Sequence, residues 1–207
     1  MLISRYIINM LTNNTYILAS SSKSRKLILQ NCGLKFKQVR PLCNEELIKK
    51  SIKGKLKPTN IAKTLSYEKA KSISLKKNYF KHYVIGCDTL IYLDNKVFDK
   101  AKNMYEAQSK IIKLSGKTHK IVSGLTICKN GKKVWQTSET TSVKIRKLKP
   151  LQIEKYLKKT GKQILNSVGC YQIEALGPNV IENIKGDYFN VLGLPLFKLL
   201  NYISKIK

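Results

Sequence analysis

The most apolar stretch of the chain covers residues 83–93 and sets the main condition on its fold. It reads Tyr-Val-Ile-Gly-Cys-Asp-Thr-Leu-Ile-Tyr-Leu, with Asp88 as its one charged residue. Near-continuous hydrophobicity of this kind is typical of a strand covered on both faces, which calls for a sheet between helical layers. A carboxylate inside such a strand is costly unless a cation or hydrogen bonds compensate for its charge. Two interpretations follow: Asp88 bonds to its own neighbours through Thr89, or it lines a ligand crevice.

Further apolar segments around this strand predict a mixed α/β architecture. The predicted strands are residues 16–19, 83–93, 121–128, 134–137, 138–145, 169–173 and 180–184. The predicted helices are residues 23–32, 58–77, 103–114, 150–161 and one that begins at Pro195. Asn130-Gly131 is a strong hairpin signal, so the sheet cannot be purely parallel. We expect an α/β fold with a mixed twisted sheet and flanking helices.

Two of the predicted helices carry faces that matter for function. In the first, Leu27, Ile28 and Cys32 are expected to form the apolar face. In the second, Lys69 stands four residues from Leu65 and four from Ile73, so it falls on the buried stripe. A lysine in that position either extends its ammonium group to water or reaches into a site.

The charge balance is strongly basic. Forty Lys and Arg residues stand against twelve Asp and Glu, a formal net charge of +28. Such a charge suits nucleic acid, an anionic membrane or a phosphorylated small molecule. The basic residues are spread along the chain in ones and twos, which favours a lysine-biased composition over a dedicated polyanion-binding face. A non-enzymatic nucleic-acid-binding or division-regulating protein is the alternative, and the salt dependence of DNA binding would separate the two.

Cysteine and histidine usage limits the chemistry further. The five cysteines are far apart and form no Cys-x-x-Cys pair, which argues against a disulfide framework or zinc site and indicates a reducing, cytoplasmic compartment. Two isolated histidines offer little material for a catalytic triad. No apolar run approaches the length of a membrane helix. Residues 1–13 are expected to be a dispensable extension, followed by one domain over residues 14–207.

Several polar groups remain as candidates for a phosphate-binding or metal-binding site. The turn Ser20-Ser21-Ser22 precedes a helix that carries Arg25 in its first turn, and backbone N–H groups, hydroxyls and a guanidinium there favour a phosphate. Glu45 and Glu46 are either solvated or, with an acidic strand residue nearby, able to hold a divalent metal. Lys100 by itself indicates no function in so lysine-rich a chain. It becomes a candidate because it follows the serine turn, Glu45, Lys69 and Asp88 in order along the chain.

The ordered set of these motifs resembles the Maf family, the septum-formation-inhibitor-like nucleoside triphosphate pyrophosphatases. Seven segments of the chain resemble signatures of the family. Residues 18–26 resemble L-A-S-x-S-P-x-R-R, residues 44–45 D-E, residues 68–70 x-K-A and residues 85–89 I-G-x-D-T. Residues 100–101 resemble K-P, residues 114–119 L-S-G-x-x-H and residues 186–195 G-D-Y-x-N-V-x-G-L-P. The resemblance covers about residues 16–204. Departures occur at Lys23 and Ala101, which replace prolines, and at Lys26, which replaces an arginine.

The resemblance implies a two-lobed fold similar to that of inosine triphosphate pyrophosphatases, with the site in the cleft, and hydrolysis of a nucleoside triphosphate to a monophosphate and pyrophosphate. Asp88 would be the catalytic base and would hold Mg²⁺ or Mn²⁺ together with Glu45. The phosphate ligands would be Ser20, Ser22, Arg25, Lys69 and Lys100. The resemblance also implies a homodimer, nucleotide-pool cleaning and a link to division arrest, with neither specific nucleic acid nor membrane as a partner.

The resemblance does not fix the base preference, because three positions of the chain point to different substrates. Family members acting on dTTP and UTP typically have arginine at the position of Ser24 and glutamine at that of Glu174. Those resembling 7-methyl-GTP enzymes have glutamate at the position of Glu174 but glutamine at that of Thr89. A glutamate accepts hydrogen bonds from guanine-type N–H donors and repels edges that only accept. The balance favours a modified or purine-like base.

Overall fold

The computed structural model describes residues 15–52, 54–94 and 96–206, which form two compact units. Unit 1 consists of the residues up to Asp88, Ser123–Glu139 and the residues from Gly193 onward. Unit 2 consists of Thr89–Val122 and Thr140–Leu192. The predicted extension, residues 1–13, lies outside the described residues.

The described strands form a seven-stranded mixed sheet in the order β2-β1-β3-β5-β6-β7, with β4 paired to β3. β1 is parallel to both β2 and β3, whereas the β3–β4 and β6–β7 pairs are antiparallel. The strands are β1 (Tyr16–Ala19), β2 (Phe36–Val39), β3 (Tyr83–Leu93), β4 (Lys96–Phe98), β5 (Thr118–Lys129), β6 (Lys132–Ile145) and β7 (Ile181–Lys185). The α/β class and the mixed sheet predicted from the sequence are confirmed.

Helices accompany the strands in both units. In unit 1 they are α2 (Lys23–Asn31), α3 (Glu45–Ile52), α4 (Pro58–Ser74) and α8 (Leu196–Ile203), and in unit 2 they are α5 (Met104–Leu114), α6 (Pro150–Thr160) and α7 (Tyr188–Val191). Short 3-10 helices occur at Lys77–Tyr79, Gly161–Asn166 and Gly177–Asn179. Across the described part of the chain, every helix is too short or too polar to cross a membrane.

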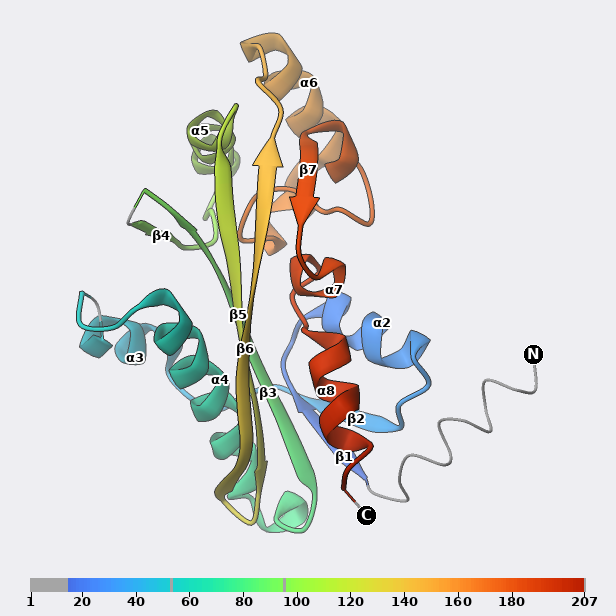
Figure 1. The fold of residues 1–207 in the computed structure, drawn as a ribbon. Helices are drawn as coiled ribbons and strands as arrows, with labels where there is room; N and C mark the ends of the chain where they lie inside the picture. The colour runs from blue at the N-terminus through green and yellow to red at the C-terminus, as the bar shows by residue number, and fades with distance from the viewer. Residues whose placement is uncertain (1–14, 53, 95, 207) are drawn as a thin grey trace. The chain divides into compact units, whose positions relative to one another are not determined.

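The strands of unit 1 are covered on both sides, with α4 on one side and α2 and α8 on the other (Figure 1). α4 approaches the sheet closely because two glycines remove side chains from the interface. A Cβ atom at Gly86 on β3 would lie 2.1 Å from the carbonyl oxygen of Ser66, and one at Gly124 on β5 would lie 2.2 Å from that of Ala62. The apolar interface includes Ile17, Ala19, Ala70, Ile73, Val84 and Cys128. The double covering predicted for residues 83–93 is therefore present in the part of this strand that belongs to unit 1, residues 83–88.

Several local predictions hold. Strand 83–93 has the predicted bounds, and Pro58 occupies the first turn of α4. The hairpin turn between β5 and β6 has φ 53° at Asn130 and 71° at Gly131, the left-handed conformation that this dipeptide favours.

Three local predictions are wrong, and each has a physical reason. Leu27 is 56% exposed, because the buried face of α2 consists of Arg25, Ile28 and Leu29. Residues 169–173 form no strand, since Cys170 has φ 55°, which extended backbone does not adopt. The two strands predicted at 134–137 and 138–145 are a single strand, β6, because the segment contains no Gly, Pro, Asn or Asp that would end a strand.

Unit 2 has its own core, built mainly around β5, β6, α5 and α6. Its buried members include Ile91, Leu93, Ala107, Ile111, Leu114, Ile121, Val143, Ile145, Ile153 and Ile164. Asn190, fully buried, donates from Nδ2 to the carbonyl oxygen of Ile121 at 3.2 Å and to Thr141 Oγ1 at 3.0 Å. Thr141 Oγ1 in turn donates to the carbonyl oxygen of Asp187 at 3.0 Å. The segment Gly186-Asp187-Tyr188-Phe189-Asn190 is thus bonded to β5 and β6.

A buried histidine in unit 2 makes the stability of the protein depend on pH. His119 is 1% exposed, its Nε2 atom lies 2.5 Å from the Tyr171 hydroxyl, and burial lowers its pKa from 6.5 to about 4. Since the unfolded chain binds a proton at a higher pH than the folded chain does, this stabilisation is present above pH 6.5 and lost as the pH falls towards 4. Between pH 7 and pH 4.5 we expect His119 to account for a loss of about 2 kcal/mol of unfolding free energy.

Urea denaturation of the wild type and His119→Gln at both pH values would measure this loss, because glutamine does not titrate. The wild type should lose more stability on acidification than the variant does. Equal losses in the two proteins would show that another group carries the pH dependence.

Candidate active site

The centre of the candidate site is a buried ammonium group shared by two carboxylates in unit 1. Lys69 Nζ lies 2.6 Å from Asp88 Oδ1 and 2.9 Å from Glu45 Oε2. Lys69 is 6% exposed and Asp88 is 7% exposed, whereas the Glu45 side chain is 41% exposed. Lys69 therefore does not extend its ammonium group into bulk water. It supplies the positive charge that Asp88 requires inside its apolar strand.

The backbone explains why these three side chains meet. Gly86 lets α4 lie against β3, and Lys69 on that helix is then opposite Asp88, two residues further along the strand. Glu45 is the first residue of α3, whose N-terminus is capped by Asn44: its Oδ1 atom accepts a hydrogen bond from the N–H of Leu47 at 3.1 Å. An acidic residue in the first turn of a helix is also favoured by the helix dipole.

The electrostatic environment keeps Lys69 protonated. Burial by itself lowers the pKa of Lys69, and the nearby positive charge of Arg25 acts in the same direction. The negative charges of Asp88 and Glu45, together with the hydrogen bond to Asp88, outweigh both, so the pKa is raised above its ordinary value of 10.5. The site consequently carries a permanent cation at neutral pH.

The serine turn that precedes α2 is held in shape by its own hydrogen bonds. Ser22 is the N-cap of α2, and its hydroxyl accepts from the N–H of Arg25 at 3.3 Å. The N–H of Ser22 donates to Ser20 Oγ at 3.2 Å. Gln38 on β2 donates from Nε2 to the carbonyl oxygens of Ser20 and Ser22 at 2.7 and 3.1 Å. A turn fixed in this way at a helix N-terminus is suited to an anion.

Arg25 connects this turn to the strand that carries Asp88. Its Nη1 atom donates to Ser20 Oγ at 3.1 Å and to the carbonyl oxygen of Cys87 at 2.8 Å. Its Nε atom donates to the carbonyl oxygen of Gly193 at 2.7 Å, and the residue is 9% exposed. These bonds place the serine turn and Asp88 on either side of one guanidinium. These bonds give Arg25 an organising role, and the phosphate-binding role expected of it from the sequence stays a prediction.

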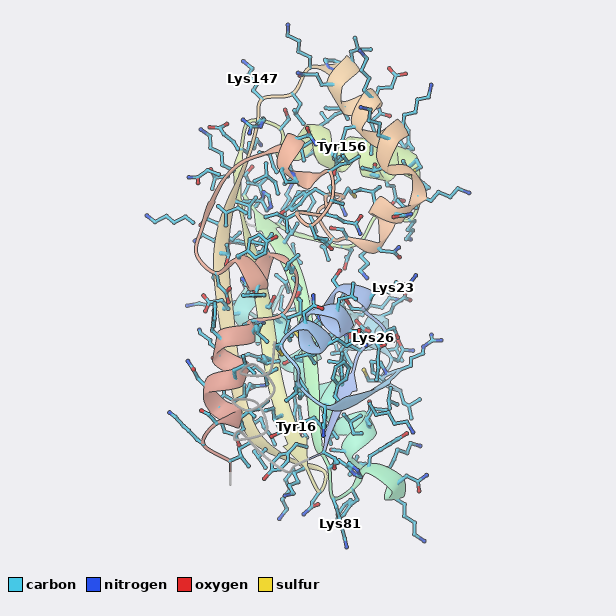
Figure 2. The ribbon with its side chains drawn as sticks, turned by 90° about the vertical axis from the view of Figure 1, so that its right-hand side faces the viewer. Tyr16, Lys23, Lys26, Lys81, Lys147 and Tyr156 are labelled. Atoms are coloured by element: carbon cyan, nitrogen blue, oxygen red, sulfur yellow. The ribbon has the colours of Figure 1, made fainter. Side chains whose placement is uncertain are left out.

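The remaining predicted site residues are distributed over the two units. Ser24, half-buried, lies in α2 of unit 1, whereas Thr89 (half-buried), Lys100 (exposed) and Glu174 (exposed) belong to unit 2. Lys23 and Lys26, labelled in Figure 2, are exposed on α2 and keep positive charge close to the serine turn. The structure brings together Ser20, Ser22, Arg25, Glu45, Lys69 and Asp88 within unit 1.

The carboxylates of Glu45 and Asp88 form a donor set that suits a hard divalent cation. Both direct an oxygen atom at the same point, which the Lys69 ammonium occupies. Among the described residues no group of three or more His, Cys, Asp or Glu side chains converges. Mg²⁺ typically binds one or two carboxylates and completes its shell with phosphate oxygens and water, and these two residues fit that pattern.

Two contributors to the site were not predicted from the sequence. Gln38 fixes the serine turn from a neighbouring strand, and a single glutamine in a short polar strand carries no signal that would reveal this. The Gly193 carbonyl oxygen accepts from Arg25 and from the thiol of Cys87, whose Sγ atom lies 3.2 Å away. Helix α3 was also missed, although Asn44 followed by Glu45 and Glu46 is a recognisable helix start.

Comparison with known proteins identifies the family of this chain. Residues 15–206 match the family described as Maf-like protein. The chain is 34% identical over 187 residues to a nucleoside triphosphate pyrophosphatase of Caulobacter vibrioides, covering 90% of this chain and 92% of that protein. It is 38% identical over 186 residues to a 7-methyl-GTP pyrophosphatase of Bartonella henselae, covering 90% and 92%. A nucleoside triphosphate pyrophosphatase of Pelagibacter ubique is 34% identical over 192 residues, covering 92% and 97%. The chain belongs to the Maf family.

Proposed function

We propose that this protein hydrolyses a nucleoside triphosphate between its α- and β-phosphates, releasing a nucleoside monophosphate and pyrophosphate. The observation that carries the proposal is the buried Lys69 ammonium between Asp88 and Glu45, connected through Arg25 to the serine turn. The arrangement combines a carboxylate able to accept a proton with cations and N–H groups able to bind phosphate. Two relatives of this chain are named nucleoside triphosphate pyrophosphatase and 7-methyl-GTP pyrophosphatase, which supports this class of reaction.

In the proposed mechanism Asp88 accepts a proton from a water molecule as the water oxygen attacks the α-phosphorus. The bond between the α-phosphorus and the bridging oxygen breaks, and pyrophosphate leaves with the electron pair of that bond. Lys69 and the hydroxyl groups of Ser20 and Ser22 donate hydrogen bonds to phosphate oxygens, and Lys100 is assigned to hold phosphate as well. The guanidinium of Arg25 keeps the turn oriented.

A divalent cation completes the proposal. Glu45 and Asp88 would hold Mg²⁺ or Mn²⁺, which when bound would shield the triphosphate charge and stabilise the leaving pyrophosphate. We further propose a homodimer in the cytoplasm, with nucleotide-pool cleaning as its role and a connection to division arrest. The dimer and the physiological role are carried over from the resemblance to the Maf family, and five free cysteines are consistent with a reducing compartment.

For the base, we propose a purine-like or modified one. Glu174 is exposed and offers a carboxylate that accepts hydrogen bonds from N–H donors on a base edge. Relatives named for 7-methyl-GTP and relatives named for nucleoside triphosphates in general are similarly close to this chain. Discrimination therefore depends on individual residues rather than on overall similarity.

The test is a panel of normal and modified nucleoside triphosphates, assayed for pyrophosphate and orthophosphate with Mg²⁺, with Mn²⁺ and with a chelator. We expect metal-dependent release of pyrophosphate alone, with 7-methyl-GTP or another purine nucleotide turned over faster than dTTP and UTP. Release of orthophosphate would contradict the assigned bond cleavage. The absence of any hydrolysis across the panel would overturn the proposed function.

A further inference from the structure

A second buried lysine, Lys110, lies in unit 2 and has no part in the mechanism above. It is in α5 and is 8% exposed, on the same helix face as the buried Ala107, Ile111 and Leu114. Lysine is rarely buried to this extent unless its ammonium group finds partners. Burial lowers the pKa of Lys110, an effect opposed by the nearby Cys170, Asp99 and Glu106.

The partners of Lys110 are backbone carbonyl groups in two segments outside the regular strands and helices. Its Nζ atom donates to the carbonyl oxygen of Asp99, just after β4, and to that of Val168 at 3.0 Å. Hydrogen bonds from an ammonium group are stronger than those between neutral groups. One side chain thus joins segment 99–103 to segment 167–174.

Each of these segments is also fixed at a second point. In segment 99–103, the N–H of Lys102 donates to Glu106 Oε2 at 2.9 Å. Segment 167–174 is closed internally by Ser167 Oγ, which donates to the carbonyl oxygen of Tyr171 at 2.6 Å, and it is fixed to β5 by the Tyr171 hydroxyl, which lies 2.5 Å from His119 Nε2. Two unit 2 residues with proposed roles at the site lie close to these bonds. Lys100, proposed to bind phosphate, follows Asp99 directly, and Glu174, proposed to select the base, lies three residues after Tyr171.

We infer that Lys110 is a positioning residue that sets Lys100 for phosphate binding and Glu174 for base selection by holding the carbonyl groups of Asp99 and Val168; the inference rests on the proposed function. The ammonium group has three N–H donors, which allows it to serve both carbonyls at once. Methionine has a similar length and no donor, so it would fill the same space while releasing both segments.

The experiment compares Lys110→Met with Lys113→Met, an exposed lysine on the same helix. Hydrogen exchange should become faster in residues 99–103 and 167–174 of Lys110→Met and remain unchanged in β1 and β3. For the preferred nucleotide, KM should rise about tenfold, because Lys100 and Glu174 would have to be ordered on binding, with kcat within about threefold of the wild type. The preference for that nucleotide over the next best should fall several-fold. Lys113→Met should match the wild type in every measurement.

Two outcomes would overturn the inference. One is a folded Lys110→Met protein with unchanged exchange in both segments. The other is faster exchange with unchanged KM and unchanged selectivity. If Lys110→Met does not fold, Lys110→Gln, which keeps an amide donor, takes its place. It should show the same changes to a smaller extent. If the wild type hydrolyses no nucleotide in the panel, the proposed function fails, and the exchange measurement still decides whether Lys110 holds the two segments.

Discussion

The Asp88→Asn variant is expected to lose pyrophosphate release while remaining folded. An amide cannot accept the proton of the attacking water, and removal of a general base typically lowers the rate by about 10²–10⁴-fold. The fold should persist because Lys69 keeps its ion pair with Glu45 at 2.9 Å, so its buried ammonium is not left without a carboxylate. Steady-state pyrophosphate release and urea denaturation would measure the two effects separately.

Asp94→Asn provides a matched control for this variant. Asp94 pairs with Lys117 at 3.1 Å, and both side chains are more than half exposed, so the same chemical change there should cost about 0–1 kcal/mol and leave turnover intact. Its φ of 47° is one that asparagine tolerates. Wild-type turnover in Asp88→Asn would show that another group activates water and that the assigned mechanism is wrong.

The Lys69→Met variant is expected to lose both activity and stability. Methionine removes the cation shared by Asp88 and Glu45, which leaves Asp88 buried and uncompensated, whereas the half-exposed Glu45 remains in contact with water. Breaking a buried ion pair on one side typically costs about 3–5 kcal/mol. Turnover should fall as well, because the cation proposed to hold a phosphate oxygen is gone. Chemical denaturation and pyrophosphate release of purified Lys69→Met would test both effects.

A double variant identifies the cause of the lost stability. Adding Asp88→Asn to Lys69→Met replaces the uncompensated charge by a neutral amide, so stability should recover in part, by more than additivity of the single changes allows. Lys63→Met, a partly exposed lysine on the same helix, should change stability little. If the double variant is only as stable as additive losses imply, the ion pair does not account for the burial of Lys69.

How far the sequence predicts the fold depends on whether the deciding interaction is local. The bounds of strand 83–93, the start of α4 at Pro58 and the Asn130-Gly131 turn follow from hydrophobic runs and backbone preferences within a few residues. The face of α2 does not, because Arg25 is buried by acceptors that come from Cys87 and Gly193. A prediction that places arginine at the surface therefore assigns the wrong face of α2 to the core and expects Leu27 to be buried.

The site residues likewise divide into those that the local sequence identifies and those that it does not. An aspartate in an apolar strand and a lysine on an apolar helix stripe are unusual enough that Asp88 and Lys69 could be singled out from local sequence, although two interpretations stayed open for each. That they compensate each other depends on Gly86, whose missing side chain allows α4 to approach β3. Glu45 joins the site from α3, as one interpretation of the acidic pair Glu45-Glu46 and the family resemblance had suggested, whereas nothing around Gln38 on β2 reveals its part in the site.

The sequence alone therefore determined the α/β class, the central buried strand with its acid and the basic character of the chain, since these depend on composition and short-range periodicity. The predicted phosphate ligands came from the local sequence of the serine turn and from the resemblance to the Maf family. Only the tertiary structure decided that one ammonium group serves both Glu45 and Asp88, that Arg25 bonds to backbone carbonyl groups, and that Lys110 joins two distant segments. The reason is that the partner of a buried charge is chosen by how closely helices and strands approach, and that distance is set by side chains far apart in the chain.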